Sequence, residues 1–215
     1  MNKALVIGDS RLCSVHRYQT NKKPSGYQEL DIMPFPGATI QDVLNHTKKV
    51  LENFDYSLVY ISAGVNNLTR MTGLSVIPNE TFLKYMPVNL ISICQIFLNE
   101  MESLYPDTKF VFCPVLGISL DKYNCHIQKK TFTSYTNNDV QSKINCSTYQ
   151  FSKYMKNTVN FSFNVSTPEY EKGIVSYTRK KVIVNYSKFH DGLHLDQTVS
   201  INMYNEFLRC KRLDF

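Results

Sequence analysis

A serine near the start of the chain and a histidine near its end have the residue types of a hydrolytic site. Ser10 ends an apolar run, LVIGDS, that stops at Gly-Asp-Ser. Asp191 and His194 lie three residues apart, close to the C-terminus. A serine hydroxyl becomes a good nucleophile when a histidine removes its proton, and a carboxylate can hold that histidine in the required tautomer. The chain order Ser, Asp, His is one that hydrolytic triads use.

Two further segments could supply hydrogen-bond donors to the oxyanion that forms in acyl transfer. Gly37 follows a candidate strand and opens a candidate helix, so its N–H can approach a ligand with no side chain in the way. Asn66 follows another candidate strand, and its side-chain amide can donate directly. Each motif alone also fits an ordinary turn or helix cap. The prediction of a catalytic site therefore rests on their combination.

These motifs fall at the ends of segments that alternate between strand and helix patterns. Strands are expected at Ala4–Ile7, Glu29–Met33, Leu58–Ile61, Phe110–Cys113 and Val159–Phe163. Helices are expected over residues 40–54, over 87–105 with Pro87 in the first turn, over 138–157, and after Gln197. Residues 117–135 are expected to form a long polar loop, and residues 173–177 and 182–184 a hairpin. This alternation predicts a parallel sheet covered on both faces, with ligands at the carboxyl ends of its strands.

With these motifs in place, the chain resembles the SGNH hydrolases of the GDSL esterase/lipase superfamily over nearly its whole length. The resemblance assigns the four invariant positions of the family to Ser10, Gly37, Asn66 and His194. Asp191 completes the catalytic triad with Ser10 and His194. The resemblance implies a flavodoxin-like three-layer α/β/α sandwich with a mainly parallel five-stranded sheet, in a single domain over residues 1–215. It also implies hydrolysis of esters or thioesters without a cofactor or a metal.

Two residues depart from the family pattern. Arg11 follows Ser10 where the family usually has leucine or a similar residue, and Asn67 follows Asn66 where the family usually has aspartate. Neither change removes a catalytic atom. We expect Arg11 to influence what binds near the nucleophile and Asn67 to alter the support of the Asn66 loop. The Pro-Gly-Ala-Thr and Asp-Gly-Leu-His blocks also resemble the esterase-like domains of some animal LINE-type retrotransposons.

The sequence thus predicts a serine esterase acting on a short acyl or acetyl ester, such as a lipid or an acetylated sugar. Ser10 attacks the carbonyl, while His194, oriented by Asp191, moves the proton. The oxyanion is held by the N–H groups of Ser10 and Gly37 and by the Asn66 amide. The loops 67–79 and 117–135 are expected to contact the substrate. The alternative is a catalytically silent module of the same fold that binds nucleic acid or another polyanion.

Composition sets the expected surroundings of this site. The net charge of +6 is spread over short basic clusters, which favours an ordinary solvated surface with at most weak attraction to polyanions. No apolar run reaches the roughly 18 residues of a membrane span, and the N-terminus lacks the apolar core of a signal peptide. An intracellular, cytoplasmic protein with reduced cysteines is therefore expected. The six cysteines include no CxxC pair, which argues against a zinc site.

Two patterns oppose these expectations. Asn-x-Ser/Thr sequons, which would be glycosylated in a secreted protein whose leader is missing, begin at Asn45, Asn67, Asn79, Asn145, Asn160, Asn164 and Asn185. His190 and His194 have an H-x-x-x-H spacing that suits zinc on a helix. Gly192 between the two histidines indicates a loop instead.

Overall fold

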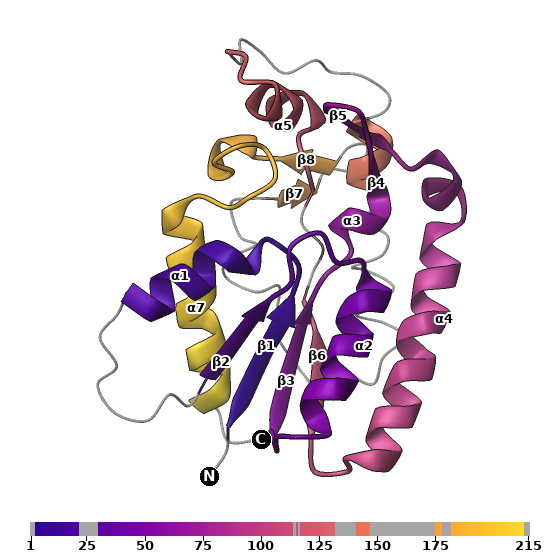
Figure 1. The fold of residues 1–215 in the computed structure, drawn as a ribbon, viewed down its shortest axis with the longest axis vertical. Coiled ribbons are helices and arrows are strands. Elements are labelled where there is room, and N and C mark those ends of the chain that lie inside the picture. The colour runs from indigo at the N-terminus through magenta and orange to yellow at the C-terminus, as the bar shows by residue number, and fades with distance from the viewer. Residues whose placement is uncertain are drawn as a thin grey trace.

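A four-stranded parallel sheet forms the centre of the computed structural model, which describes residues 3–21, 30–113, 115, 117–131, 141–146, 175–177 and 182–212 (Figure 1). The strand order is β2-β1-β3-β6. These strands are β1 (Ala4–Gly8), β2 (Leu30–Pro34), β3 (Leu58–Ser62) and β6 (Lys109–Phe112). All five residues of β1 and of β3 are buried, as the continuous apolar pattern of these segments predicts for strands covered on both faces.

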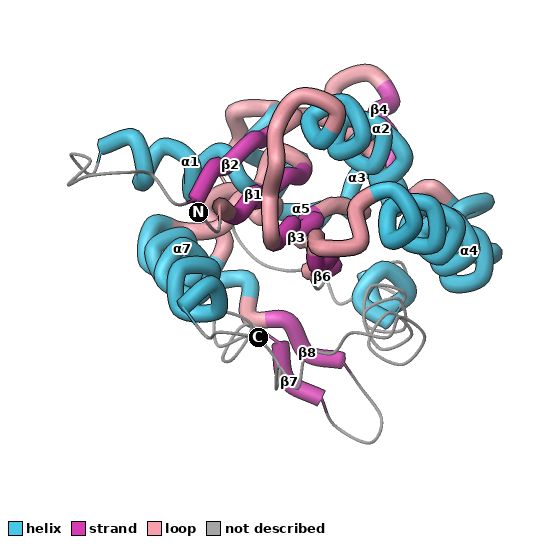
Figure 2. The backbone as a smooth tube through the Cα atoms, turned by 90° about the horizontal axis from the view of Figure 1, so that it is seen from below, coloured by secondary structure: helices cyan, strands magenta, loops and turns pink. Residues whose placement is uncertain are grey.

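Helices cover both faces of this sheet. The side chains of Ala4 and Val6 pack in one core with α1 (Leu12–Asn21) and α7 (Gln197–Arg212). Leu5 and Ile7 alternate with them and pack in a second core with α2 (Ile40–Leu51) and α4 (Glu80–Leu104). Figure 2 shows α7 and α2 on opposite sides of the strands. The predicted three-layer α/β/α sandwich is therefore confirmed, because successive residues of a strand point to opposite faces.

Shorter elements gather beyond the carboxyl ends of the strands (Figure 1). They are α3 (Val65–Leu68), the antiparallel hairpin of β4 (Thr69–Thr72) and β5 (Ser75–Pro78), and α5 (Leu120–Ile127). A second antiparallel hairpin pairs β7 (Val175–Tyr177) with β8 (Val182–Val184), as predicted. The 3-10 helix η1 (Tyr186–Lys188) precedes the His194 loop. Among the described residues, no helix combines the length and apolarity that crossing a membrane requires.

The expected number of strands is wrong for the part of the chain that the structure describes. The sheet there has four strands instead of five. The expected fifth strand, Val159–Phe163, lies outside the described residues, and its apolar residues alternate with Asn160 and Ser162, a weaker pattern than that of the buried strands. Of the helix expected over residues 138–157, the described residues 141–146 are helical.

The structure also differs from the prediction at α4 and at residues 117–135. Helix α4 begins at Glu80, so Pro87 lies inside it and not in its first turn. Proline weakens a helix interior, but the buried residues Leu90 and Cys94 follow and pack against the core. The expected loop 117–135 contains α5, which Ser119 caps by accepting the Lys122 N–H. The amphipathic spacing of a helix this short is easily taken for a polar loop.

At Gly8 the backbone of β1 lies close against that of β3. A Cβ atom added there would lie 2.0 Å from the carbonyl oxygen of Ser62. The Asp9 N–H donates to this same oxygen at 3.0 Å. A glycine is therefore required by backbone contact at the point where β1 leads into the Ser10 turn.

We expect Gly8→Ala to lower the free energy of unfolding by about 3 kcal/mol, because the added methyl group forces two paired strands apart. Gly73→Ala is the matched control. Gly73 has φ +57 and nothing within 4 Å of an added Cβ, so its substitution costs about 1 kcal/mol from backbone conformation alone. Urea unfolding followed by circular dichroism measures both. Equal losses of unfolding free energy in the two variants would contradict the close backbone contact at Gly8.

Candidate active site

Ser10 lies in the turn between β1 and α1 and is half-buried. The turn is fixed by two hydrogen bonds, from the Asp9 N–H to the Ser62 carbonyl and from the Arg11 N–H to Asp9 Oδ1, each 3.0 Å long. Between the described residues, no hydrogen bond occupies the Ser10 hydroxyl or its backbone N–H. Within the described part of the chain, both groups are therefore left open at the carboxyl end of β1.

The carboxyl group of Asp9 beside Ser10 is 2% exposed. Burial raises its pKa, while the positive charge of Arg11, N–H donors from Arg11 and Val65, and the charge of His194 act in the opposite direction. Hydrogen bonds link both segments to the same stretch of chain, because Arg11 Nη2 donates to the Gly117 oxygen and the Ser119 N–H donates to the Gly192 oxygen, each at 2.8 Å. The Ser10 turn and the His194 loop are therefore anchored to neighbouring residues, although they are far apart in the sequence.

A closed loop holds Asp191 and His194 together. An antiparallel bridge between Phe189 and Leu195 closes this loop. Inside it, Asp191 Oδ1 accepts the N–H groups of Leu193 at 2.9 Å and of His194 at 2.7 Å. Asp191 Oδ2 lies 2.6 Å from His194 Nδ1. The structure thus brings the two predicted residues into direct contact before α7 begins.

These contacts set the charge of Asp191 and the tautomer of His194. Burial opposes ionisation of Asp191, which is 4% exposed, but hydrogen bonds from the His194 side chain and from the N–H groups of His194 and Leu193 outweigh it and hold its pKa well below the ordinary value. An ionised carboxylate at Nδ1 requires a proton on that nitrogen. Nε2 is left to exchange protons with a nucleophile. The His194 side chain is 32% exposed, so a substrate can reach it.

Helix α5 supports the histidine loop from outside. Gly192 has φ +96, and a Cβ there would lie 2.8 Å from both the Ser119 oxygen and the Tyr123 nitrogen. The Ser119 N–H donates to the Gly192 oxygen at 2.8 Å. Lys122 Nζ donates to the backbone oxygen of Phe189 at 2.6 Å. Helix α5, and with it this support of the histidine loop, was not predicted from the sequence. The capping residue Ser119 was the local signal that could have revealed the helix.

Aromatic side chains of α5 surround the Asp191–His194 pair. The Tyr123 ring lies edge-on to the His194 ring at 6.2 Å, and burial together with the charge of Asp191 raises the pKa of Tyr123. His126 Nε2 lies 3.9 Å from Asp191 Oδ2, and its ring is 6.0 Å from that of His190. His190 is in the loop, as Gly192 indicated. Among the described residues, no group of three or more His, Cys, Asp or Glu side chains is placed to hold a metal ion.

The two segments predicted to form the oxyanion hole contact each other. Asn66 Nδ2 donates to the Ala38 oxygen at 2.9 Å, which leaves the second hydrogen of this amide for a ligand. The Phe35 N–H donates to the Gly8 oxygen at 2.7 Å and so attaches the Gly37 loop to the end of β1. Gly37 is exposed and has φ +81. Its backbone conformation, not lack of space, favours glycine at this position.

Asn67 supports the loop in a way that accounts for its departure from the family pattern. Its side chain accepts the Ile40 N–H through Oδ1 and donates through Nδ2 to Gln41 Oε1, both at 2.8 Å. An aspartate could accept from Ile40 but could not donate to Gln41. Asn67 is also 6% exposed, so its sequon cannot carry a glycan in this fold.

Arg11, in the turn that carries Ser10, is buried rather than exposed to a ligand. Its side chain is 5% exposed, and Nη2 donates to the Gly117 oxygen at 2.8 Å. Its charge also counteracts the burial of Asp9. Arg11 therefore connects the turn to the segment that leads into α5, which is a different role from the influence on ligand binding that we expected.

Known structures share this fold, although no protein-family profile and no curated protein sequence matches the chain. A GDSL-like lipase from Bacteroides thetaiotaomicron superposes with a TM-score of 0.57 at 15% identity, over 98% of this chain and 87% of that one. The lipase/acylhydrolase from Enterococcus faecalis gives 0.51 at 16% identity, over 97% and 94%. An acetyl xylan esterase gives 0.51 at 12% identity, over 97% and 98%. The chain therefore has the fold of the GDSL-type hydrolases.

We expect Arg11→Met to lower the free energy of unfolding by about 2 kcal/mol, because it removes a charge-assisted hydrogen bond and leaves the Asp9 carboxyl group without its neighbouring cation. The KM for a small soluble ester such as p-nitrophenyl acetate should not change, since the side chain is buried. Urea unfolding and initial rates measure the two quantities. A raised KM with unchanged stability would show that Arg11 contacts the substrate.

The stability that Asp191 contributes should depend on pH. Its folded pKa lies below that of the unfolded chain, which is about 3.9. The contribution is therefore complete above that value and is lost as the pH falls toward the folded pKa, because only the unfolded state takes up the proton there. Unfolding of the wild type and of Asp191→Asn between pH 3 and pH 7 should give a stability difference that shrinks below about pH 4. A stability difference between the two proteins that does not change with pH would contradict this prediction.

Proposed function

We propose that this chain is a single-domain serine esterase that hydrolyses short acyl or acetyl esters, with Ser10 as nucleophile and Asp191 and His194 as its base. The observation that carries the proposal is the buried Asp191 carboxylate bonded to His194 Nδ1. Such a contact serves a histidine that must accept a proton at Nε2. The solved structures that share the fold are consistent with ester hydrolysis, but a fold alone does not define a reaction.

The proposed reaction has two halves. Ser10 Oγ attacks the ester carbonyl while His194 Nε2 takes the hydroxyl proton, giving a tetrahedral oxyanion. The N–H groups of Ser10 and Gly37 and the Asn66 amide donate to this oxyanion. The ester bond then breaks, and His194 returns the proton to the leaving alcohol. A water molecule, deprotonated by His194, attacks the acyl-serine; the bond to Ser10 Oγ then breaks, His194 returns the proton to Oγ, and the carboxylic acid is released.

We further propose that the protein works in the cytoplasm. Two observations support this location. Asn67 and Asn145 are 6% and 7% exposed, so glycans at these sequons would require local unfolding. The cysteines in the described part of the chain include the free thiols of Cys13, Cys94, Cys125 and Cys146. Free thiols are the usual state in reducing compartments.

Substitution of the nucleophile tests the mechanism. Ser10→Ala should lower kcat for p-nitrophenyl acetate at least about a thousandfold, because no other group in the mechanism forms the acyl intermediate. A fluorophosphonate should label the wild type and not the variant. Ser14→Ala is the matched control: its hydroxyl lies one turn further along, 2.8 Å from that of Ser200, and its loss should leave turnover intact.

Two results would contradict this mechanism. Wild-type turnover by Ser10→Ala would exclude Ser10 as nucleophile. A wild type that neither turns over esters nor reacts with the fluorophosphonate would instead favour the silent module, whose basic surface would then be tested for binding to single-stranded RNA.

A further inference from the structure

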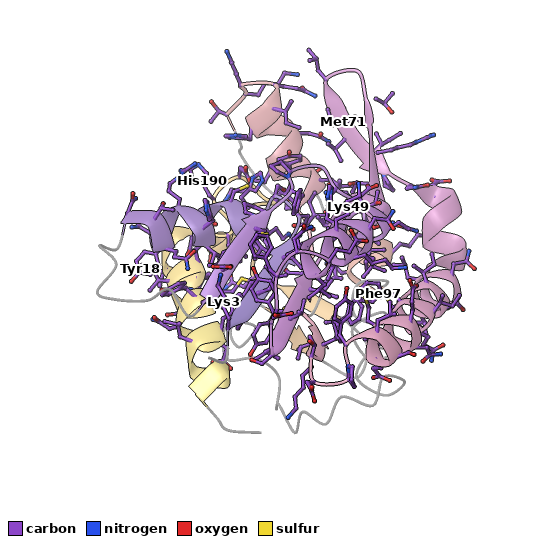
Figure 3. The ribbon with its side chains drawn as sticks, turned by 60° about the horizontal axis from the view of Figure 1, so that its bottom comes forward. Lys3, Tyr18, Lys49, Met71, Phe97 and His190 are labelled. Atoms are coloured by element: carbon purple, nitrogen blue, oxygen red, sulfur yellow. The ribbon has the colours of Figure 1, made fainter. Side chains whose placement is uncertain are left out.

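The tip of the β4–β5 hairpin exposes two large apolar side chains. Met71 is 60% exposed and Leu74 is 74% exposed. Thr72 and Gly73, which connect them, are exposed as well. Figure 3 shows Met71 on the hairpin that projects from the body of the molecule. Exposed apolar residues that lie together on a projecting element mark candidate interaction sites.

Helix α5 holds this tip in place. The side-chain amide of Asn124 pairs with the backbone of Val76, accepting its N–H at 2.6 Å and donating to its oxygen at 2.9 Å. Gln128 Nε2 donates to the Leu74 oxygen at 3.2 Å and to Ser75 Oγ at 2.8 Å. Met71 and Leu74 are therefore presented on a fixed platform.

Positive charges flank the apolar tip. After Gln128 the chain turns through Lys129, which has φ +54, and the N–H groups of Lys129 and Lys130 bond back to the last turn of α5. Both lysines are exposed, as is Arg70 on β4. No acidic residue occurs in segments 70–78 or 122–131. We call Arg70, Met71, Leu74, Lys129 and Lys130 the hairpin patch.

The hairpin patch lies at the same end of the molecule as the candidate site. The hairpin and α5 both stand beyond the carboxyl ends of the strands (Figure 1). One part of α5 touches the histidine loop through Ser119 and Tyr123, and its last turn leads to the lysines. Because an eight-residue helix is about 12 Å long, a surface that meets the patch also lies close to the His194 loop.

We propose that the hairpin patch docks the protein on an anionic lipid surface. Met71 and Leu74 would enter the boundary between headgroups and acyl chains, while Arg70, Lys129 and Lys130 attract anionic headgroups. Apolar side chains bordered by cations are the chemistry of this interface. A nucleic acid would attract the cations but leave the Met71 and Leu74 side chains in water. That the ester substrate also lies in this surface rests on the proposed esterase function.

Vesicle binding tests the patch without relying on catalysis. The full chain carrying Ser10→Ala is sedimented with vesicles of phosphatidylcholine, alone or mixed with phosphatidylserine. We expect binding to the mixed vesicles only. Adding Met71→Ser with Leu74→Ser should weaken it at least about tenfold, since apolar burial is lost. Lys129→Asn with Lys130→Gln should weaken it by about tenfold or more, and asparagine tolerates the positive φ at position 129.

The matched control combines Lys49→Gln with Leu104→Ser. It removes an exposed cation and a 61% exposed leucine at the ends of α2 and α4, at the opposite end of the sheet (Figure 1). This variant should bind mixed vesicles like the parent. Thermal unfolding verifies that every variant is folded.

Several outcomes would overturn the proposal. They are no binding to mixed vesicles, equal binding by all variants, or loss in the control as large as in the patch variants. Retention of single-stranded RNA that depends on Lys129 and Lys130 but not on Met71 and Leu74 would assign the patch to nucleic acid instead. Hydrolysis of soluble p-nitrophenyl acetate is measured separately, on the wild-type chain that retains Ser10. If vesicles bind but no ester is hydrolysed, only the esterase function fails.

Discussion

The candidate site depends on the solvation of one buried carboxylate. Asp191 is 4% exposed, so its charge must be satisfied by donors from the protein. These donors come from the backbone of Leu193 and from the backbone and side chain of His194. They converge only because the Phe189–Leu195 bridge closes the loop and Gly192 lets it press against α5. The contacts that solvate Asp191 are therefore the same contacts that orient His194.

The sheet brings the remaining parts of the site to this loop, and hydrogen bonds between loops hold them there. Parallel strands end at one edge, so the Ser10 turn and the Gly37 and Asn66 segments meet although they are distant in sequence. Asn66 bonds to Ala38, Phe35 to Gly8, and Arg11 to Gly117. Each loop is thus anchored to a neighbouring loop as well as to its own strand, which limits how far a donor can move from its position.

The sequence predicted those features that have a local pattern. Ala4–Ile7 and Leu58–Ile61 are continuous apolar runs, and both are buried strands. The three-residue spacing of Asp191 and His194 likewise suffices for their contact. Helix α5 was missed because eight residues provide too little periodicity. The hydrogen bonds from Arg11 to Gly117 and from Asn67 to Gln41 join different segments of the chain. No sequence pattern relates these segments, so only the folded structure reveals the bonds.

These two bonds change how the departures from the family motif are interpreted. Arg11 adjoins Ser10 and was expected to influence what binds there, whereas Asn67 adjoins Asn66 and was expected to alter the support of its loop. Both side chains instead point into the protein and bond to other segments. A motif residue can vary in this way when a compensating partner, such as Gln41, is present. Differences in what reaches the site would then arise in elements that surround the motif without forming it. Helix α5 and the β4–β5 hairpin are such elements, because α5 contacts the histidine loop and the hairpin bonds to α5 while its tip faces solvent.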